Sequence, residues 1–258
     1  MSVRILRPGQ KILTIGNPGL RVISPRGGAV PAWSPTDITG LKLWIDFSDA
    51  TTLFTDAGTT PVSADGNAIY QANDKSGNGY HATQTNATYK PTYKTNIKNG
   101  LSVARSDGND MLSLSPVSTS GSYTFFFVYT VPDNGTDDWL FDTQSGRLVL
   151  AHDYGDGVAW NATVWRKIAA LQTGWQILTF SFVSGGNGTI YRDGASLGSA
   201  GYSAKNIGGS SRLFGAYDSL GSNGIIGDFA EVIIYESALT ETDRGTVHTY
   251  LNNKWDIY

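Results

Sequence analysis

The segment that most constrains the fold runs from residue 227 to residue 255. Residues 227–235 are rich in β-branched and aromatic side chains, which predicts a strand that is buried over most of its length. Thr240 then offers an N-cap oxygen, and Asp243 follows three residues later as a weaker form of the capping box. Apolar residues come next at helical spacing, namely Val247, Tyr250, Leu251 and Trp255. The chain therefore ends in a core strand and a short amphipathic helix that closes the core.

Strand patterns fill the rest of the chain, and no long helical pattern precedes Thr240. Apolar runs predict further strands at residues 41–47, 123–131, 176–183 and 212–216. Asp193-Gly194 predicts the turn of a hairpin that begins at residue 189. The 31 glycines and the low charged fraction of 16% fit many short strands joined by tight turns. We expect an all-β fold that is large enough to need no disulfide bonds.

Several classes of chemistry are excluded by what the sequence lacks. There is no cysteine, so a disulfide framework, thiolate catalysis and cysteine-based zinc sites are absent. No apolar run approaches the length of a membrane span. Glycine and proline interrupt residues 1–23, so we expect no signal peptide there. The glycine motifs that bind phosphates or dinucleotides are also missing.

The first 36 residues differ from the rest in net charge and in the spacing of proline, glycine and apolar residues. They carry a net charge of +5 within a chain whose total is −3, so the remainder carries −8. Prolines and glycines separate two short apolar pieces, which suit docking on a partner surface as an added strand. We expect a basic extended arm at residues 1–36 and a single body at 37–258, with a disordered tail as the alternative for the arm. The expected docking residues are Arg4, Arg7, Lys11, Ile12, Leu13, Ile15, Arg21, Val22 and Ile23.

Several segments of the body resemble the concanavalin A-like jelly roll. More closely, they resemble the laminin-G-like domains that are common in bacterial surface proteins and in tailed-phage structural proteins. The segments are residues 41–46, 73–79, 191–194 and 227–235, then Tyr250-Leu251 and Lys254-Trp255. The resemblance implies an antiparallel jelly-roll sandwich of two sheets, one of them concave. Lectins, glycan hydrolases and structural modules share this fold, so the fold alone does not settle the function.

A glycan hydrolase is the least expected of these functions. Glycosidases need two carboxylates at a set distance, and on a regular strand these lie at alternate positions. Asp228, Glu231 and Glu236 have mixed parity and do not line one face of a regular strand, so we expect Glu231 to make a structural hydrogen bond beneath the C-terminal helix. The G-x-S-x-G pattern at residues 194–198 follows a hairpin turn, where it does not form a nucleophile elbow.

Glycan binding needs an aromatic side chain for the sugar ring and polar side chains for its hydroxyls. Three tryptophans fall in predicted strand or helix motifs and are assigned to the core, namely Trp44, Trp175 and Trp255. The expected ligand-binding residues lie in the turn-rich central section and are Trp139, Trp160, Trp165, Asp138, Asp153 and Asn161. Ordinary packing in the core is the alternative for these tryptophans.

Calcium is the one cofactor that the sequence suggests. Loops in the central section supply the hard oxygen ligands that this ion prefers, although none has the register of an EF-hand. The candidate ligands are Asp137, Asp138, Asp153 and Asp156. The alternative is that these side chains make local turns.

Together, these features lead us to expect a non-enzymatic structural protein of a virion surface, of the head-decoration, head-fibre or tail-fibre type. The arm would dock on capsid or tail proteins, and the body would form homo-oligomers that display a lectin-like jelly roll towards host glycans. The alternative is a carbohydrate-binding module of a bacterial secreted or surface protein, located outside the cell. We expect no nucleic-acid partner, because the body is acidic, and no membrane partner.

Overall fold

The computed structural model describes residues 33–258, apart from residues 116, 118–120, 133, 134, 136, 145, 146, 156, 208, 217–220 and 222. Within the described residues, seventeen strands form two antiparallel sheets, and one α-helix ends the chain. This confirms the predicted all-β sandwich with a short C-terminal helix. All nine predicted docking residues of the arm lie outside the described residues, so the docking role stays a prediction.

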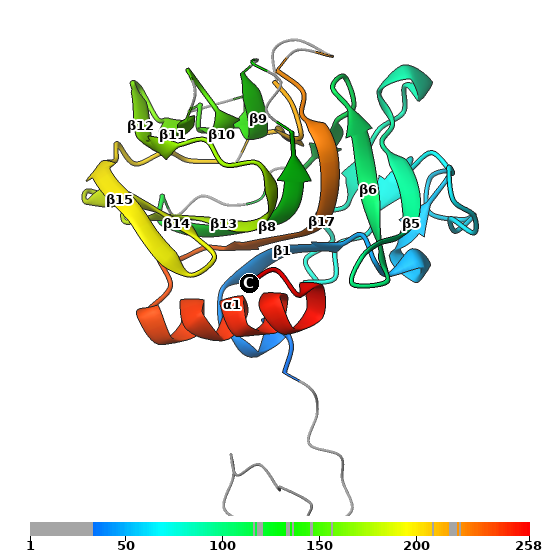
Figure 1. Ribbon diagram of the computed structural model, residues 1–258, viewed down its shortest axis with the longest axis horizontal. Coiled ribbons are helices and arrows are strands. Elements are labelled where there is room, and N and C mark those ends of the chain that lie inside the picture. The colour runs from blue at the N-terminus through cyan, green and yellow to red at the C-terminus, as the bar shows by residue number, and fades with distance from the viewer. Residues whose placement is uncertain are drawn as a thin grey trace, which may run out of the picture. The chain divides into compact units, whose positions relative to one another are not determined.

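Sheet A runs in the order β15-β14-β13-β8-β17-β6-β5, with β1 also paired to β17 (Figure 1). Its strands are β1 (Leu41–Asp46), β5 (Thr92–Lys98), β6 (Leu101–Asp107), β8 (Tyr123–Val131), β13 (Gly174–Phe182), β14 (Asn187–Arg192), β15 (Ala195–Gly201) and β17 (Ile226–Tyr235). The predicted Asp193-Gly194 turn joins β14 to β15. Both residues have positive φ angles, 52° and 83°, as a two-residue type I′ turn requires.

Sheet B runs in the order β12-β11-β10-β9-β16-β7-β4-β3-β2 and lies across from sheet A (Figure 1). Its strands are β2 (Leu53–Phe54), β3 (Gln71–Ala72), β4 (Ala82–Thr83), β7 (Leu112–Leu114), β9 (Asp138–Thr143), β10 (Val149–Asp153), β11 (Gly157–Asn161), β12 (Trp165–Ala170) and β16 (Ser211–Leu213). The described residues also form three short 3₁₀ helices, one before β1 and two between the early strands: η1 (Pro35–Asp37), η2 (Ala50–Thr52) and η3 (Ala87–Tyr89).

The core between the sheets is built from alternate residues of the central strands. The inward side chains of β8 and β13 belong to the buried cluster between the sheets: Tyr123, Phe125, Phe127, Tyr129, Val131, Leu178, Phe180 and Phe182. The outward residues Phe126 and Val128 are buried as well, in a second cluster with the C-terminal helix. β8 is therefore apolar on both faces because both of its faces are covered.

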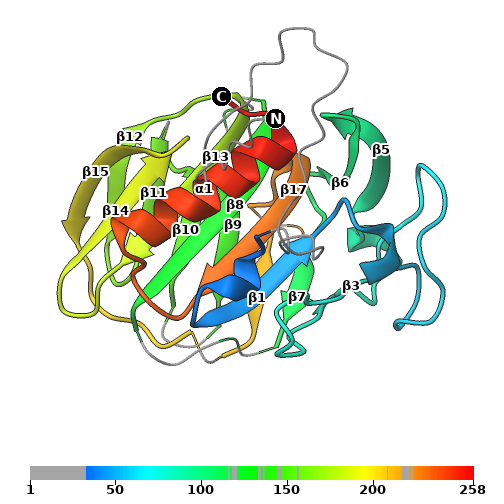
Figure 2. The ribbon, with the colours of Figure 1, turned by 90° about the horizontal axis from the view of Figure 1, so that it is seen from below.

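Helix α1 (Glu241–Trp255) covers the face of sheet A that points away from sheet B (Figure 2). The predicted N-cap is confirmed, since the Asp243 amide donates to the Thr240 hydroxyl at 3.1 Å. Val247, Leu251 and Trp255 are fully buried against the sheet. No helix in the described residues is long and apolar enough to cross a membrane.

A buried carboxylate ties this helix to both β1 and β17. Glu231 is 1% exposed and accepts hydrogen bonds from four donors. They are Trp44 Nε1 at 2.6 Å, the Tyr250 hydroxyl at 2.8 Å, Lys254 Nζ at 2.9 Å and Trp255 Nε1 at 2.8 Å. The structural hydrogen bond that the sequence suggested for Glu231 is confirmed, and it is one of four. Three of the donors belong to α1, so this side chain fixes the helix on the sheet.

The body begins earlier than the predicted position 37. The rings of Trp33 and Tyr250 lie 5.3 Å apart, and the Tyr235 hydroxyl donates to the Pro35 carbonyl at 2.9 Å. Ser34 caps the short helix η1. Residues 33–36 were assigned to the arm because prolines and a charge boundary surround them, but they pack on the same cluster that holds α1.

Replacing Glu231 with glutamine is expected to destabilise the body by about 3 kcal/mol, because an amide group would face the donors of a buried ion pair. Urea unfolding followed by tryptophan fluorescence measures this loss. The matched control is Glu236→Gln, which breaks the partly exposed pair with Lys42 at 2.7 Å. The control should cost less than about 1 kcal/mol. Equal losses in the two variants would contradict an anchoring role for Glu231.

Candidate ligand-binding site

The outer face of sheet B, which points away from the core, carries one row of side chains across six strands. Residues directly opposite each other on paired strands share a face. The strand registers link Ser113, Arg212, Asp142, Val149, Asn161 and Trp165 in this way, from β7 to β12. The neighbouring row points inward and belongs to the core between the sheets: Leu112, Leu213, Phe141, Leu150 and Trp160. Asn161 and Trp165 therefore lie on the outer face.

A second row brings Trp139 to the same face. Ala151 is the cross-strand partner of both Trp139 and Ala159, and Ala159 is the partner of Lys167. Neither alanine belongs to the core cluster between the sheets in the described residues. The two small side chains leave room for the large ones on either side to fold over them. Trp139 and Lys167 therefore flank a shallow central strip of the sheet.

Trp139, Tyr154 and Trp165 form a cluster on this surface, which we call the aromatic face. The Trp139 and Trp165 rings lie 6.0 Å apart at 53°, and Tyr154 stacks on Trp165 at 3.7 Å and 9°. All three residues are half-buried. Such contacts hold aromatic rings in fixed orientations. The structure thus brings two predicted ligand tryptophans together and adds Tyr154, which the sequence reading missed although it directly follows the candidate Asp153.

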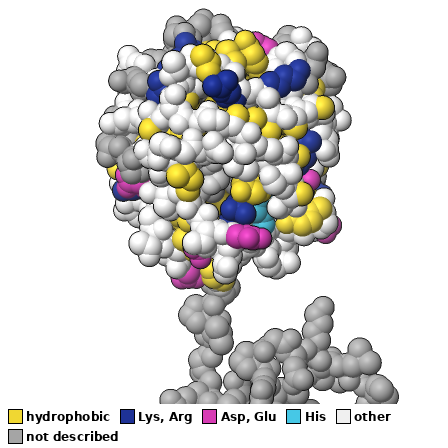
Figure 3. All heavy atoms as spheres, turned by 90° about the vertical axis from the view of Figure 1, so that its left-hand side faces the viewer, with side chains coloured by type: hydrophobic (Ala, Val, Ile, Leu, Met, Phe, Trp, Pro, Cys, Tyr) yellow, Lys and Arg dark blue, Asp and Glu magenta, His cyan; other side chains and the backbone are white. Residues whose placement is uncertain are grey.

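A cation lies over one of these rings. The Arg147 guanidinium is 5.1 Å from the centre of the Trp139 ring. It also donates to the buried Asp142 carboxylate through Nε at 3.2 Å and through Nη2 at 3.0 Å. Figure 3 shows Lys and Arg side chains beside hydrophobic ones at the top of this side of the molecule, where β11 and β12 lie in Figure 1. The aromatic face is therefore partly basic.

The remaining polar candidates have structural partners. Asp138 and Asp153 are 1% and 3% exposed, and Asp153 accepts a hydrogen bond from the Gly157 amide at 3.2 Å. Asn161 accepts one from the Thr163 amide at 2.9 Å, which holds the turn between β11 and β12. Asn161 is half-buried on the outer face. Of these three side chains, it is the one placed to contact a ligand.

Trp160 must be removed from the predicted ligand set. It is 1% exposed and packs edge-on against Phe182 with ring centres 5.5 Å apart. It points into the core because it is the strand neighbour of the outward-facing Asn161, and successive side chains alternate between faces. The turn-rich setting of Trp160 suggested exposure, but β11 is a regular strand of the sandwich.

Three of the four predicted calcium ligands lie at one end of the β9–β10 pair. Asp138 and Asp153 occupy partner positions, and Asp137 accepts a hydrogen bond from the Gly155 amide at 3.4 Å. Asp156 lies outside the described residues. No group of three or more metal-binding side chains occurs in the part of the chain that the structure describes. Calcium binding therefore stays a prediction, which calorimetric titration of the protein and of Asp153→Asn would test.

The inward side of β10 holds a neutral histidine. His152 is fully buried, and its Nδ1 lies 2.6 Å from the Tyr129 hydroxyl. Burial lowers the pKa of His152 to about 3, and the nearby charge of Arg192 acts in the same direction. The ring is therefore uncharged at neutral pH. It lies in the core, away from the aromatic face.

The carboxylates of β17 do not follow the parity that the sequence suggested. A β-bulge at Ala230 separates Phe229, opposite Tyr129, from Glu231, opposite Val128. Asp228 and Glu231 consequently share the outer face of sheet A, and the prediction that they lie on different faces is wrong. Both carboxylates are engaged, because Asp228 pairs with Arg105 at 2.6 and 2.8 Å and Glu231 anchors α1.

The serine of the G-x-S-x-G pattern lies where the sequence placed it. Ser196 is exposed on β15, directly after the hairpin turn. A nucleophile elbow needs a strand followed by a helix. β15 is instead the second strand of a hairpin, so the pattern does not form an elbow.

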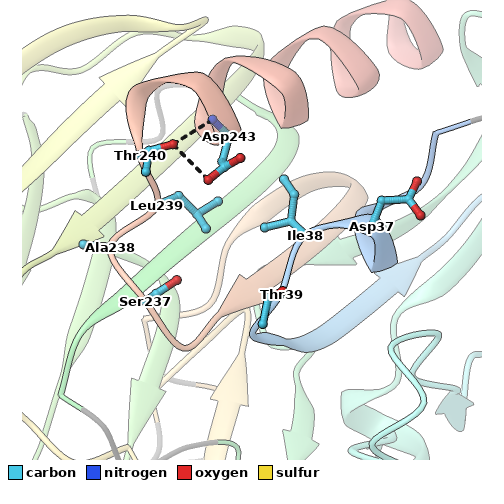
Figure 4. A pocket seen from close by; sticks show the side chains of 8 residues that line it. All are labelled: Asp37, Ile38, Thr39, Ser237, Ala238, Leu239, Thr240 and Asp243. Atoms are coloured by element: carbon cyan, nitrogen blue, oxygen red, sulfur yellow. Dashed lines mark hydrogen bonds between the residues drawn. The ribbon is translucent and has the colours of Figure 1, made fainter.

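A pocket of about 420 Å³ lies beside the first turn of α1 (Figure 4). Its lining comes from the segment around η1 and from the connection between β17 and α1: Asp37, Ile38, Thr39, Ser237, Ala238, Leu239, Thr240 and Asp243. No aromatic side chain lines it, and two of its polar residues, Thr240 and Asp243, cap the helix. The aromatic face is therefore the better candidate for a sugar.

No protein-family model and no curated protein sequence matches the chain. The fold does match solved structures. Domain 4 of a GH43 extracellular arabinanase from Geobacillus stearothermophilus, solved in complex with arabinotriose, has a TM-score of 0.57 at 18% identity. The match covers 81% of this chain and 98% of that domain.

Two binding domains match in the same way. The binding domain of Paraclostridial Mosquitocidal Protein 1 has a TM-score of 0.59 at 14% identity, over 84% of this chain and 53% of that one. The ligand-binding domain of botulinum neurotoxin serotype D, in complex with N-acetylneuraminic acid, has a TM-score of 0.53 at 12% identity, over 82% and 51%. The chain thus spans about half the length of each of these two structures. At these identities the matches show a shared β-sandwich fold.

Replacing Arg147 with alanine is expected to destabilise the body by about 1–3 kcal/mol, because the buried Asp142 loses two charged hydrogen bonds. Urea unfolding gives the loss. Arg166→Ala is the control. Arg166 is exposed on β12, the edge strand of sheet B, so this variant should change the stability by less than about 0.5 kcal/mol. If the two variants were equally stable, Asp142 would not depend on Arg147.

Proposed function

We propose that residues 33–258 form a non-enzymatic carbohydrate-binding module whose ligand lies on the aromatic face. The observation that carries the proposal is the cluster of Trp139, Tyr154 and Trp165 on the outer face of sheet B. Of the functions expected from the sequence, this was the alternative to a virion structural role.

The chemistry of the face suits a sugar ring. The carbon-bound hydrogens of a sugar form an apolar surface that packs on an indole, while its hydroxyls need hydrogen-bonding partners at the rim. Trp139 and Trp165 offer the ring surfaces, and Arg147 and Asn161 lie beside them with polar groups. Aromatic side chains lose little conformational entropy on binding, especially where neighbouring rings already hold them.

The comparisons support a binding role. The named neighbours are a domain solved with arabinotriose and two binding domains, one of them solved with N-acetylneuraminic acid. The carboxylates of β17 are engaged in structural contacts, since Asp228 pairs with Arg105 and Glu231 anchors α1. This favours binding over hydrolysis. The proposed location is extracellular, on a bacterial surface protein or on a particle.

A glycan array is expected to give specific hits, and Trp139→Ala and Trp165→Ala should each weaken them about tenfold, because a stacking surface is lost. Trp175→Ala is the matched control. Trp175 lies on β13 and packs with the α1 cluster, on the other sheet. Circular dichroism establishes that all variants are folded. Hits that survive both substitutions would place the ligand elsewhere, and an array without hits would contradict the proposed function.

The virion assembly role of the arm stays a prediction that this binding function does not require. Deleting residues 1–32 is expected to leave the body folded but to abolish its incorporation into a larger particle, because the arm would supply the docking strand. Co-sedimentation with particles measures incorporation, and the full chain is the control. Normal incorporation of the truncated chain would remove the docking role.

A further inference from the structure

Around the aromatic face, most carboxylates are buried and two cations are exposed. Three carboxylates lie deep, since Asp138, Asp142 and Asp153 are 1%, 0% and 3% exposed. The cations reach solvent, because the Arg147 side chain is 42% exposed and Lys167 is exposed as well. A ligand that approaches this face therefore meets positive groups before these negative ones. This contrasts with the rest of the body, which carries a net negative charge.

The buried acid beneath the face holds one of these cations in place. A buried carboxylate is tolerated when it is paired and hydrogen-bonded. Asp142 receives two hydrogen bonds from Arg147, which keeps the guanidinium against the Trp139 ring. The cation is thus fixed beside the stacking surface before any ligand arrives, so little side-chain entropy is lost on binding.

The second cation, Lys167, lies on the opposite side of the alanine strip from Trp139. Its side chain crosses Gly157, because a Cβ atom at that glycine would lie 2.6 Å from Lys167 Cε. Its Nζ donates to the carbonyl of Gly155, the residue after Tyr154. In the described part of the chain no carboxylate is paired with this ammonium group. Lys167 is therefore an exposed cation beside the stacked pair of Tyr154 and Trp165.

A third cation, Arg212, lies in the outward row that contains Asp142. Arg212 is the cross-strand partner of Asp142, and its Nη1 donates to the Ala216 carbonyl at 2.9 Å. The half-buried Asp137 lies near the Gly155 end of the face, where its carboxylate accepts an amide hydrogen bond. Cations thus occur on both sides of the aromatic cluster, on Arg147 and Arg212 at one side and on Lys167 at the other.

We propose that the ligand of the aromatic face is an acidic saccharide, one whose carboxylate or sulfate groups contact Arg147 and Lys167 while a ring stacks on the tryptophans. This inference rests on the proposed carbohydrate-binding function and adds the chemical class of the sugar. The spacing of cations around stacked rings matches a ligand that alternates apolar ring faces with anionic groups.

The test compares each acidic glycan with its neutral counterpart on one array: sialylated with desialylated chains, polygalacturonate with its methyl ester, and dextran sulfate with dextran. The acidic member should bind about tenfold tighter, since two exposed cations contribute about threefold each. The preference should fall as salt is raised. The carboxylated and sulfated pairs distinguish the two sources of negative charge.

The Lys167→Gln variant tests whether the preference for acidic glycans arises at the aromatic face. It should weaken binding of the acidic member about threefold and leave the neutral member unchanged. Lys98→Gln, on β5 of sheet A, removes the same charge elsewhere and should change neither. Equal binding of acidic and neutral counterparts, or an unaltered preference in Lys167→Gln, would overturn the acidic class while the carbohydrate-binding function stands. An array without any hit would remove both.

Discussion

The fold depends on a carboxylate in an apolar setting. Glu231 lies under α1 and gathers hydrogen bonds from two indoles, a phenol and an ammonium group. Burying a charge without partners is costly, so the site exists only when α1, β1 and β17 are assembled together. Lys254 also contacts Asp46 on β1 at 2.8 Å, which extends the same network to a second acid. The terminal helix is therefore held by directional polar contacts in addition to its apolar face.

The position of Glu231 under α1 requires a β-bulge in β17, and this bulge could not be predicted from the sequence. The position of β17 and the cap of α1 could be predicted, because burial patterns and Thr240 signal them locally. The bulge at Ala230 could not, since it arises from pairing with β8 and no single residue signals it. Without the bulge, Asp228 and Glu231 would lie on opposite faces, as the parity of a regular strand requires.

The candidate site could be predicted from the sequence only in part, because strand pairing decides which side chains face outward. Trp139 and Trp165 were singled out by residue type, and the sandwich places both on the outer face. Trp160 has the same chemistry, but the strand register turns it into the core. Lys167 is two residues from Trp165, so alternation along β12 could have identified it. Arg147 has no such signal, because it lies in the connection between β9 and β10 and its place over Trp139 depends on its ion pair with Asp142 of β9.

The outer faces of the two sheets differ, which is why the proposed ligand surface is on sheet B. α1 covers the outer face of sheet A, so β8 buries apolar residues on both sides and offers nothing to a ligand there. No helix covers β9–β12 in the described residues (Figure 1). Large rings on that face contact one another over a strip of alanines and stay half-exposed. One sheet thus carries the structural anchor, and the other carries aromatic and basic side chains that stay partly exposed.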